Sequence, residues 1–189
     1  MTITTSADNP NSSTITDPYS SGGAYQWYIL SGLVENKPGV LFRITNLFRA
    51  RNFNIESITV GSTEMPDLSR MTITLKGDER IVDQLVKQLR KLIDVVEVKV
   101  LATDKTVYRE LALIKMKSED PTTRMEIANF ASIYRGSIMD ISNETITVEL
   151  IGTPDKIDAF KNLVSSYGII QVARTGVSAL PRGRLNDEL

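Results

Sequence analysis

The spacing of hydrophobic and polar residues changes in a fixed order along the first half of the chain. Residues 27–35 (WYILSGLVE) are rich in β-branched and aromatic side chains and predict a strand that ends at the turn-forming run 36–39 (NKPG). Residues 39–50 repeat apolar side chains at the spacing of one helix face and predict a helix. The stripe on that helix is shared by Val40, Ile44, Leu47 and Arg51 and is widened by Leu41 and Phe48.

Four more elements follow before residue 102. Residues 53–61 and 71–75 alternate in hydrophobicity and predict two strands joined by a loop around 64–67. Gly77 ends the second strand, and Asp78 is expected to cap the next helix. Valines in 95–100 predict a closing strand. The apolar positions of the helix are Ile81, Val82, Leu85, Leu89 and Leu92.

The second half of the chain repeats this order. A helix opened by Asp120 and Pro121 follows a strand, and a second helix follows the cap sequence 153–155. Ile157, Phe160, Leu163 and Val164 are expected to form the buried face of that second helix. The predicted strands are 111–116, the hairpin pair 136–141 and 145–151, and 169–173.

Two consecutive β-α-β-β-α-β units predict an α+β protein built from two ferredoxin-like units. Each unit is expected to be an antiparallel sheet with both helices on one face, and the units are expected to join near 102–106. One continuous α+β domain is the alternative. The helix-free face of so small a sheet needs cover, which favours pairing with a second copy of the chain.

Composition excludes several classes of function. The chain of 189 residues has 22 Lys and Arg against 23 Asp and Glu, so no basic field is present to hold nucleic acid or anionic lipid. The absence of Cys excludes disulfides and thiolate chemistry, and the absence of His removes the usual general base and the commonest transition-metal ligand. Catalysis by Asp, Glu, Lys or Ser stays open, but the composition disfavours an enzyme.

The first 24 residues differ from the rest of the chain. They are rich in Ser, Thr, Asn and Pro, lack Lys and Arg, and contain no hydrophobic run. They therefore read neither as a signal peptide nor as a transit peptide, and a disordered extension over 1–24 is expected. Because no apolar run approaches the length of a membrane span, we expect a cytoplasmic protein without a membrane partner.

The turn at 35–41 (ENKPGVL) is the most informative candidate site. A helix that starts there presents unsatisfied N–H groups and a positive dipole end, which suit a carboxylate or phosphate. Asn36 offers both a donor and an acceptor, as a zwitterionic amino acid requires. An ordinary strand-to-helix turn is the alternative, and the local pattern alone favours it. Asn54 is a second candidate, or else a capping residue, and Asn52 is expected to end the preceding helix.

Other chemistry finds little support. Glu35, Glu56, Glu64 and Asp67 do not share a face in any convincing way and are interpreted as surface charges, so no metal site is expected. An RNA-binding unit of this topology would stack bases on strand aromatics, whereas the corresponding strands here carry aliphatic and hydroxyl side chains. Nucleotide-binding glycine loops and the nucleophile-elbow motif of hydrolases are also absent from the sequence.

The stretch 33–73 closely resembles the regulatory (small) subunit of acetolactate synthase, also called acetohydroxyacid synthase. The family pattern ENxxGVLxRxxxLFxxRxxNIESLxVxxTxxxxxSRMTI is matched nearly throughout, with Asn52 where Gly is usual and Ile58 where Leu is common. The likeness continues through KQLRKLIDVVEV, ELALIKM, YRGSIMDIS and VARTGVSALPRG and covers 26–185. It implies an ACT domain over 25–101, a linker over 102–108, and a C-terminal domain of this family over 109–185.

The resemblance also implies a function. Members have no catalytic residues. They bind and activate the catalytic (large) subunit of acetolactate synthase, and they confer feedback inhibition by valine or a related branched-chain amino acid. Cofactors are expected only on that partner, as thiamine diphosphate, Mg and FAD. A stand-alone ACT-type regulator of another enzyme or of a transcription factor is the alternative, ahead of an RNA-binding module.

In ACT domains of this family the effector lies between two subunits of a homodimer. Motif matching implies an effector site made of Asn36, Gly39, Val40 and Leu41 from one protomer with Asn54 and Ile55 from its partner. The amides of 39–41 are assigned to the effector carboxylate. The side chains of Asn36 and Asn54 are assigned to its ammonium group.

Overall fold

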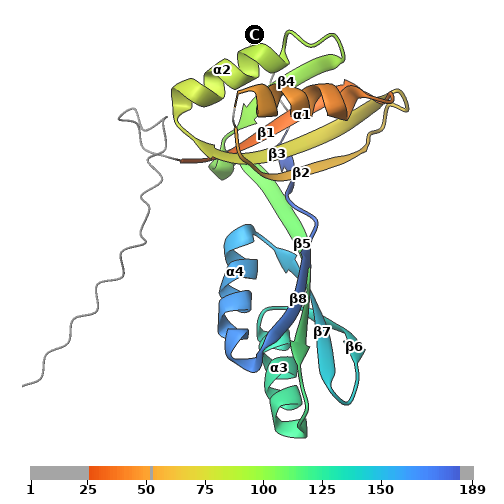
Figure 1. Ribbon diagram of the computed structural model, residues 1–189, viewed down its shortest axis with the longest axis vertical. Coiled ribbons are helices and arrows are strands. Elements are labelled where there is room, and N and C mark those ends of the chain that lie inside the picture. The colour runs from red at the N-terminus through yellow and green to blue at the C-terminus, as the bar shows by residue number, and fades with distance from the viewer. Residues whose placement is uncertain (1–25, 52, 184–189) are drawn as a thin grey trace, which may run out of the picture.

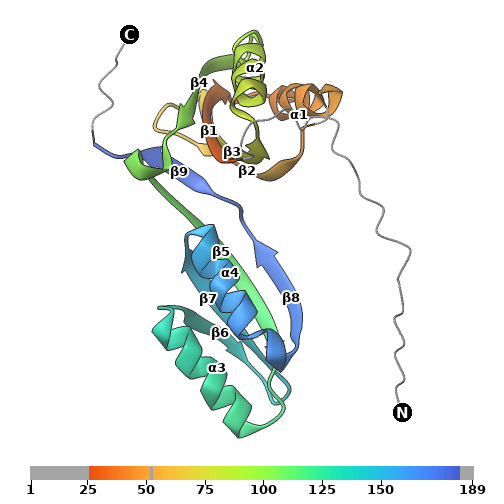
Figure 2. The same ribbon diagram turned by 90° about the vertical axis from the view of Figure 1, so that its left-hand side faces the viewer.

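The computed structural model describes residues 26–51 and 53–183, which form two layered units placed one above the other (Figure 1). Each unit is an antiparallel sheet with two helices on one face, as the perpendicular view also shows (Figure 2). The expected disordered extension over 1–24 and the expected role of Asn52 lie outside these residues. The predicted fold class, two ferredoxin-like units in an α+β protein, is confirmed.

The first unit has the sheet order β2-β3-β1-β4, with every neighbouring pair antiparallel. Helices α1 and α2 pack on one face of this sheet over a core that includes Leu30, Ile44, Phe48, Ile73 and Leu85. The elements are β1 (Gln26–Glu35), α1 (Val40–Ala50), β2 (Ile55–Ser62), β3 (Leu68–Gly77), α2 (Glu79–Leu89) and β4 (Val95–Leu101).

The second unit repeats that order as β6-β7-β5-β8, with a further short strand, β9, paired to β5. Its core includes Ile114, Ile127, Val148, Ile157 and Phe160. The elements are η1 (Thr103–Lys105), β5 (Thr106–Lys117), α3 (Pro121–Ile133), β6 (Ser137–Ile141), β7 (Thr145–Gly152), α4 (Pro154–Leu163), η2 (Ser165–Tyr167), β8 (Ile169–Arg174) and β9 (Ser178–Pro181).

The predicted helix caps are mostly confirmed. The carboxylate of Asp78 accepts a hydrogen bond from the N–H of Arg80 at 2.7 Å, and that of Asp120 accepts one from the N–H of Thr123 at 2.8 Å. Thr153 occupies the cap position of α4, but its side chain makes no capping hydrogen bond. That helix therefore relies on proline at its first turn rather than on a side-chain cap.

Strand β5 starts earlier than the sequence predicts. The expected linker over 102–108 contains the η1 turn and the first three residues of β5, which pair with β9. Strand β9 itself was not predicted, because its four residues are too few to display a period. Two expected core positions are also wrong, since Leu41 and Leu163 are exposed.

A third apolar cluster joins the two units. Ile29 and Leu101, on the helix-free face of the first sheet, are buried against Val177 and Ala179 from the end of the chain. Trp27 and Tyr108 flank the cluster with ring centroids 5.6 Å apart. The same chain thus covers part of the face for which a second copy was expected.

Candidate functional site

The turn at 36–39 is fixed by hydrogen bonds to other parts of the first unit. The N–H of Glu35 donates to the carbonyl of Asp94 at 2.9 Å, and the N–H of Asn36 donates to the carbonyl of Asp67 at 2.8 Å. The side-chain amide of Asn36 donates a longer bond, 3.4 Å, to the carbonyl of Pro66. Asn36 is thus held in place by its backbone, while its exposed side chain keeps an acceptor oxygen for another group.

Helix α1 begins without a side-chain cap. Gly39 occupies the cap position with φ of +87°, in the left-handed region, and no side chain accepts a hydrogen bond from the first turn. The first helical bond runs from the N–H of Arg43 to the carbonyl of Gly39 at 3.0 Å. The N–H groups of Leu41 and Phe42 have no hydrogen-bond acceptor among the residues that the structure describes. Amides in this position can bind a carboxylate or a phosphate.

Two ion pairs set the charge around the turn. The guanidinium of Arg43 contacts both carboxylate oxygens of Asp94, at 2.5 and 2.6 Å, and the Asp94 side chain is only 8% exposed. The hydrogen bond from Arg43 is the main cause that lowers the pKa of Asp94 below its usual value. Lys37 pairs with Glu35 at 3.0 Å. Because both carboxylates are paired with cations, they do not cancel the positive potential at the N-terminus of α1.

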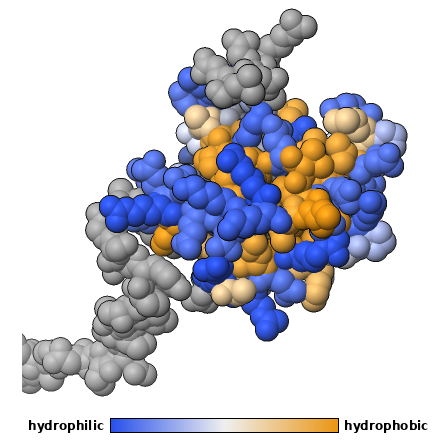
Figure 3. All heavy atoms as spheres, turned by 90° about the horizontal axis from the view of Figure 1, so that it is seen from above, coloured by the Kyte–Doolittle hydropathy of each residue, from blue (hydrophilic) through white to orange (hydrophobic). Residues whose placement is uncertain are grey.

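A small cavity of about 80 Å³ lies beside this helix start. Asn36, Val40 and Leu41 line it together with Val60 of β2 and Met71 of β3. The volume is well below the roughly 300–1,000 Å³ of typical small-molecule pockets. Apolar surface lies among hydrophilic side chains on this helix-covered end of the molecule (Figure 3), where Leu41 is 46% and Phe42 68% exposed. One chain therefore supplies a partial site that is open on one side.

Asn54 and Ile55 lie at the other end of the same sheet. Ile55 is paired with Leu75 of β3, whereas Glu35, next to the turn, is paired with Leu68. Seven residues of extended strand separate these levels, which is about 23 Å. The structure thus brings Asn36, Gly39, Val40 and Leu41 together but keeps Asn54 and Ile55 apart from them within one chain.

Sequence reasoning missed several residues of the cavity wall. Val60, Met71 and Ser69 come from the neighbouring strands, and Arg43 fixes the helix start through Asp94. The alternation within 53–61 identifies Val60 as an apolar strand position, but only the pairing of Val60 with Met71 places it beside α1. The ion pair spans 51 positions in sequence and leaves no local signal.

The described residues show neither a group of metal ligands nor a membrane-spanning helix. Residues 26–51 and 53–183 contain no group of three or more acidic side chains placed to hold a metal ion. Over the same residues, no helix combines the length and the apolar character that crossing a membrane requires.

Two family models match the chain. A model of the small subunit of acetolactate synthase matches residues 109–183, and a model of the small-subunit-like ACT domain of acetohydroxyacid synthase matches residues 30–97. The second match includes the turn, the start of α1, and both Asn54 and Ile55.

Named relatives match over most of their length. The chain is 49% identical over 156 residues to a probable acetolactate synthase small subunit of Methanothermobacter thermautotrophicus, covering 82% of this chain and 93% of that one. It is 46% identical to the small subunit of acetolactate synthase isozyme 3 of Salmonella typhimurium, covering 82% and 95%.

A solved structure agrees with these relatives. The crystal structure of the acetolactate synthase small subunit from Thermotoga maritima has a TM-score of 0.77 and 41% identity, and the match covers 85% of this chain and 99% of that one. Sequence and fold lead to the same conclusion: this chain belongs to the acetolactate synthase small-subunit family.

Proposed function

We propose that this chain is a regulatory subunit of acetolactate synthase that binds the catalytic subunit, raises its activity, and makes it sensitive to valine or a related branched-chain amino acid. The observation that carries the proposal is the uncapped start of α1 beside a small apolar cavity, within a segment that matches an ACT domain of this enzyme. Family membership supports a regulatory rather than a catalytic role.

Each end of an aliphatic amino acid has a complement at this position. The effector carboxylate would accept hydrogen bonds from the free amides of Leu41 and Phe42. Of the amides of 39–41 assigned from the sequence, only that of Leu41 is in this pair. The branched side chain would lie against Val40 and Val60. The carbonyl oxygen of the Asn36 side chain would accept from the ammonium group.

A second copy would complete the site. The partial cavity is open, and about 23 Å of strand separates the turn beside it from the level of Ile55, so a site that uses all six residues needs two chains. A ligand at such a seam binds one relative placement of the protomers better than others. The catalytic subunit can then respond to that placement as a shift in population.

In this arrangement the chemistry stays on the partner. Thiamine diphosphate, Mg and FAD would be held by the catalytic subunit, and no residue of this chain has a role in the reaction. In this proposal the effector binds to an ACT domain over 25–101, and a C-terminal domain of the regulatory-subunit type follows over 109–185.

The test is reconstitution with the catalytic subunit of the same organism. Acetolactate formation is measured with and without this chain, in the presence of valine, leucine or isoleucine in turn. We expect stimulation by the chain and inhibition of the complex by at least one of the three amino acids. Amino-acid binding in calorimetry without any effect on the catalytic subunit would instead favour a stand-alone ACT-type regulator.

A further inference from the structure

A second and larger hollow lies below the helix-free face of the first sheet. Its volume is about 960 Å³, and it is an open groove. One wall comes from β2 and β3, and the other comes from β5, β9 and the two residues after β9. Figure 2 shows β9 passing beneath the first sheet, beside the upper part of β5.

The groove carries an excess of positive charge. Arg70, Arg109 and Arg182 all line it, whereas Glu64 is its one acidic lining residue among those described. None of the three arginines pairs with a carboxylate in the described part of the chain. The chain as a whole has a net charge of −1, so this concentration of guanidinium groups is local.

Among the described residues, the side chains of these arginines donate only to neutral acceptors. The guanidinium of Arg70 donates to the hydroxyl of Ser31 at 3.4 Å, and that of Arg109 donates to the carbonyl of Tyr108 at 2.7 Å. Each guanidinium has five donors in a planar fork, so most of this capacity is left for a bound group.

Other lining groups fit a peptide. Thr72 is only 3% exposed, and its hydroxyl makes no hydrogen bond with any residue in 26–51 or 53–183. Val107 and Leu180 add partly exposed apolar surface to the second wall. The combination of cations, a free hydroxyl and apolar surface along an open groove suits an extended segment with acidic side chains, because carboxylates bind arginine through paired hydrogen bonds.

We propose that this groove docks an acidic, extended segment of the acetolactate synthase catalytic subunit. The proposal rests on the function proposed above and adds the surface through which the partner is bound. An occupant would contact the first sheet and the β5–β9 pair at once, so binding would also fix the relative placement of the two units.

The groove and the effector site share a strand. Val60 of β2 lines both the groove and the cavity beside α1. The residue before Val60 on β2 is Thr59, whose hydroxyl donates to the carbonyl of Val177 at 2.8 Å, which ties the strand to the segment leading into β9. A shift of β2 on effector binding would therefore change the groove, which gives a short physical path between the two sites.

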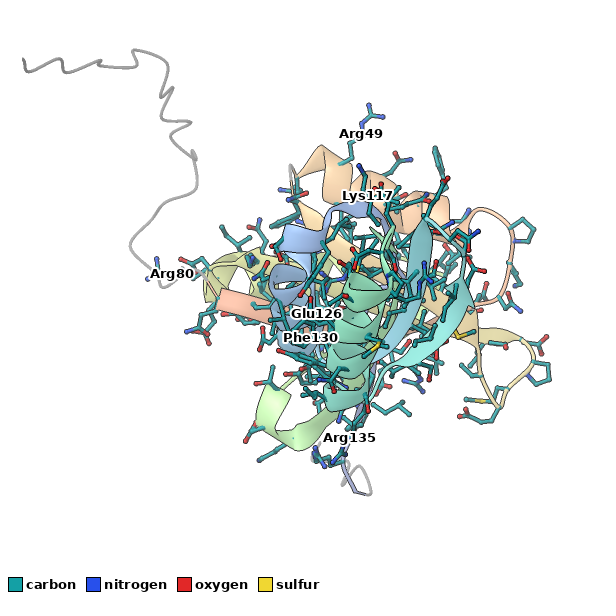
Figure 4. All side chains as sticks on the ribbon, turned by 90° about the horizontal axis from the view of Figure 1, so that it is seen from below. Arg49, Arg80, Lys117, Glu126, Phe130 and Arg135 are labelled. Carbon is teal, nitrogen blue, oxygen red and sulfur yellow. The ribbon has the colours of Figure 1, made fainter. Side chains whose placement is uncertain are left out.

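The test reverses the charge of two groove residues in the full-length chain. R109E with R182E removes two cations that make no ion pair within the described chain and are not part of its core. The matched control is R80E on α2, an exposed residue outside the groove whose side chain projects from the molecule in Figure 4. The measurement is the concentration of each chain that half-maximally stimulates the purified catalytic subunit.

We expect the double variant to need at least about tenfold more protein than wild type at low ionic strength, because like charges meet in the interface. Raising the ionic strength from about 0.01 M to about 0.15 M shortens the screening length from about 30 Å to about 8 Å. This change should weaken stimulation by the wild type and R80E, because it screens an attraction, but it should not weaken stimulation by the double variant, because there it screens a repulsion. Thermal unfolding checks that all chains are folded, and R109Q with R182Q replaces the double variant if it is not.

The outcomes separate the two proposals. Stimulation by wild type and by the double variant at the same concentration would overturn the groove assignment and leave the regulatory function intact. An absence of stimulation by wild type would overturn the regulatory function and the docking role with it. If deleting residues 184–189 abolishes the difference between wild type and the double variant, the groove binds the chain's own end, and the assignment is also wrong.

Discussion

Gly39 allows the geometry of the candidate effector site to be tested by two substitutions that share a backbone cost. Its φ of +87° lies in the left-handed region, and an added Cβ would meet only Arg43 Nη1, at an ordinary 3.5 Å. Replacement by Ala should therefore cost about 1–2 kcal/mol of unfolding free energy from backbone strain alone. For a chain of this size, that corresponds to a melting temperature lower by roughly 2–8 °C.

Gly39→Asp adds a charge at the same position. Its carboxylate lies at the start of α1, where it can cap the helix, so this variant should be at least as stable as Gly39→Ala. An effector carboxylate bound to the same amides would then lie within about 4–5 Å of a like charge. At an effective dielectric constant of about 20 the repulsion is roughly 3–4 kcal/mol, which predicts valine binding weaker by more than a hundredfold.

The assay pairs urea unfolding with calorimetric titration of L-valine for wild type, Gly39→Ala and Gly39→Asp. Gly61→Ala is the matched control, because a Cβ there meets nothing within 4 Å and its φ is not positive. Gly39→Asp should be at least as stable to urea as Gly39→Ala, whereas Gly39→Ala should bind valine more tightly than Gly39→Asp. Equal valine affinity in the two Gly39 variants would show that no carboxylate binds at this helix start.

Three further predictions concern the same framework. Asn36→Ala should keep the fold and the stimulation of the catalytic subunit but lose sensitivity to valine in the reconstitution assay, because its one side-chain bond within the described chain is long; retained sensitivity would exclude Asn36 from the site. Gly176→Ala should lower the melting temperature by more than Gly39→Ala does, because Gly176 also has a positive φ and its added Cβ would lie 2.8 Å from the Cβ of Ser57. An unchanged melting temperature would mean that Gly176 and Ser57 are not packed this closely. Arg43→Ala removes the ion pair with Asp94, which lowers the pKa of Asp94 in the folded state. The stabilising effect of the pair is therefore complete above the unfolded pKa of about 3.9 and is lost progressively as the pH falls from there through the lower folded pKa. The urea midpoints of wild type and Arg43→Ala should therefore differ at pH 7, and the difference should shrink as the pH falls below about 3.9; a gap that widens on acidification would contradict this sign.

The fold was predictable because its information is local. Periodic apolar residues, the capping carboxylates of Asp78 and Asp120, and the turn residues at 36–39 each act within a few positions of the chain. Their order was enough to predict both ferredoxin-like units. Strand β9 shows the limit, because Ser178–Pro181 is a strand only through its pairing with residues 106–109.

The site was predictable only in part. The helix start follows from the turn sequence, so the grouping of Asn36, Gly39, Val40 and Leu41 was within reach. Leu41 was assigned to the core because it falls on the apolar side of α1, yet at this first turn it is exposed and lines the open cavity. Asn54 and Ile55 lie a full strand length away, and local sequence does not encode the arrangement that would bring them together.

The return of the chain end to the first sheet limits how this protein can be divided. Val177 and Ala179 bury Ile29 and Leu101. A fragment ending at residue 101 would therefore expose two large aliphatic side chains to solvent on the helix-free face of the first sheet. Chimeras that graft effector specificity from one relative onto another should therefore transplant 26–101 and 175–183 as one block. The junctions then fall at residue 102 and after β8, where the exchange preserves the contacts of both cores.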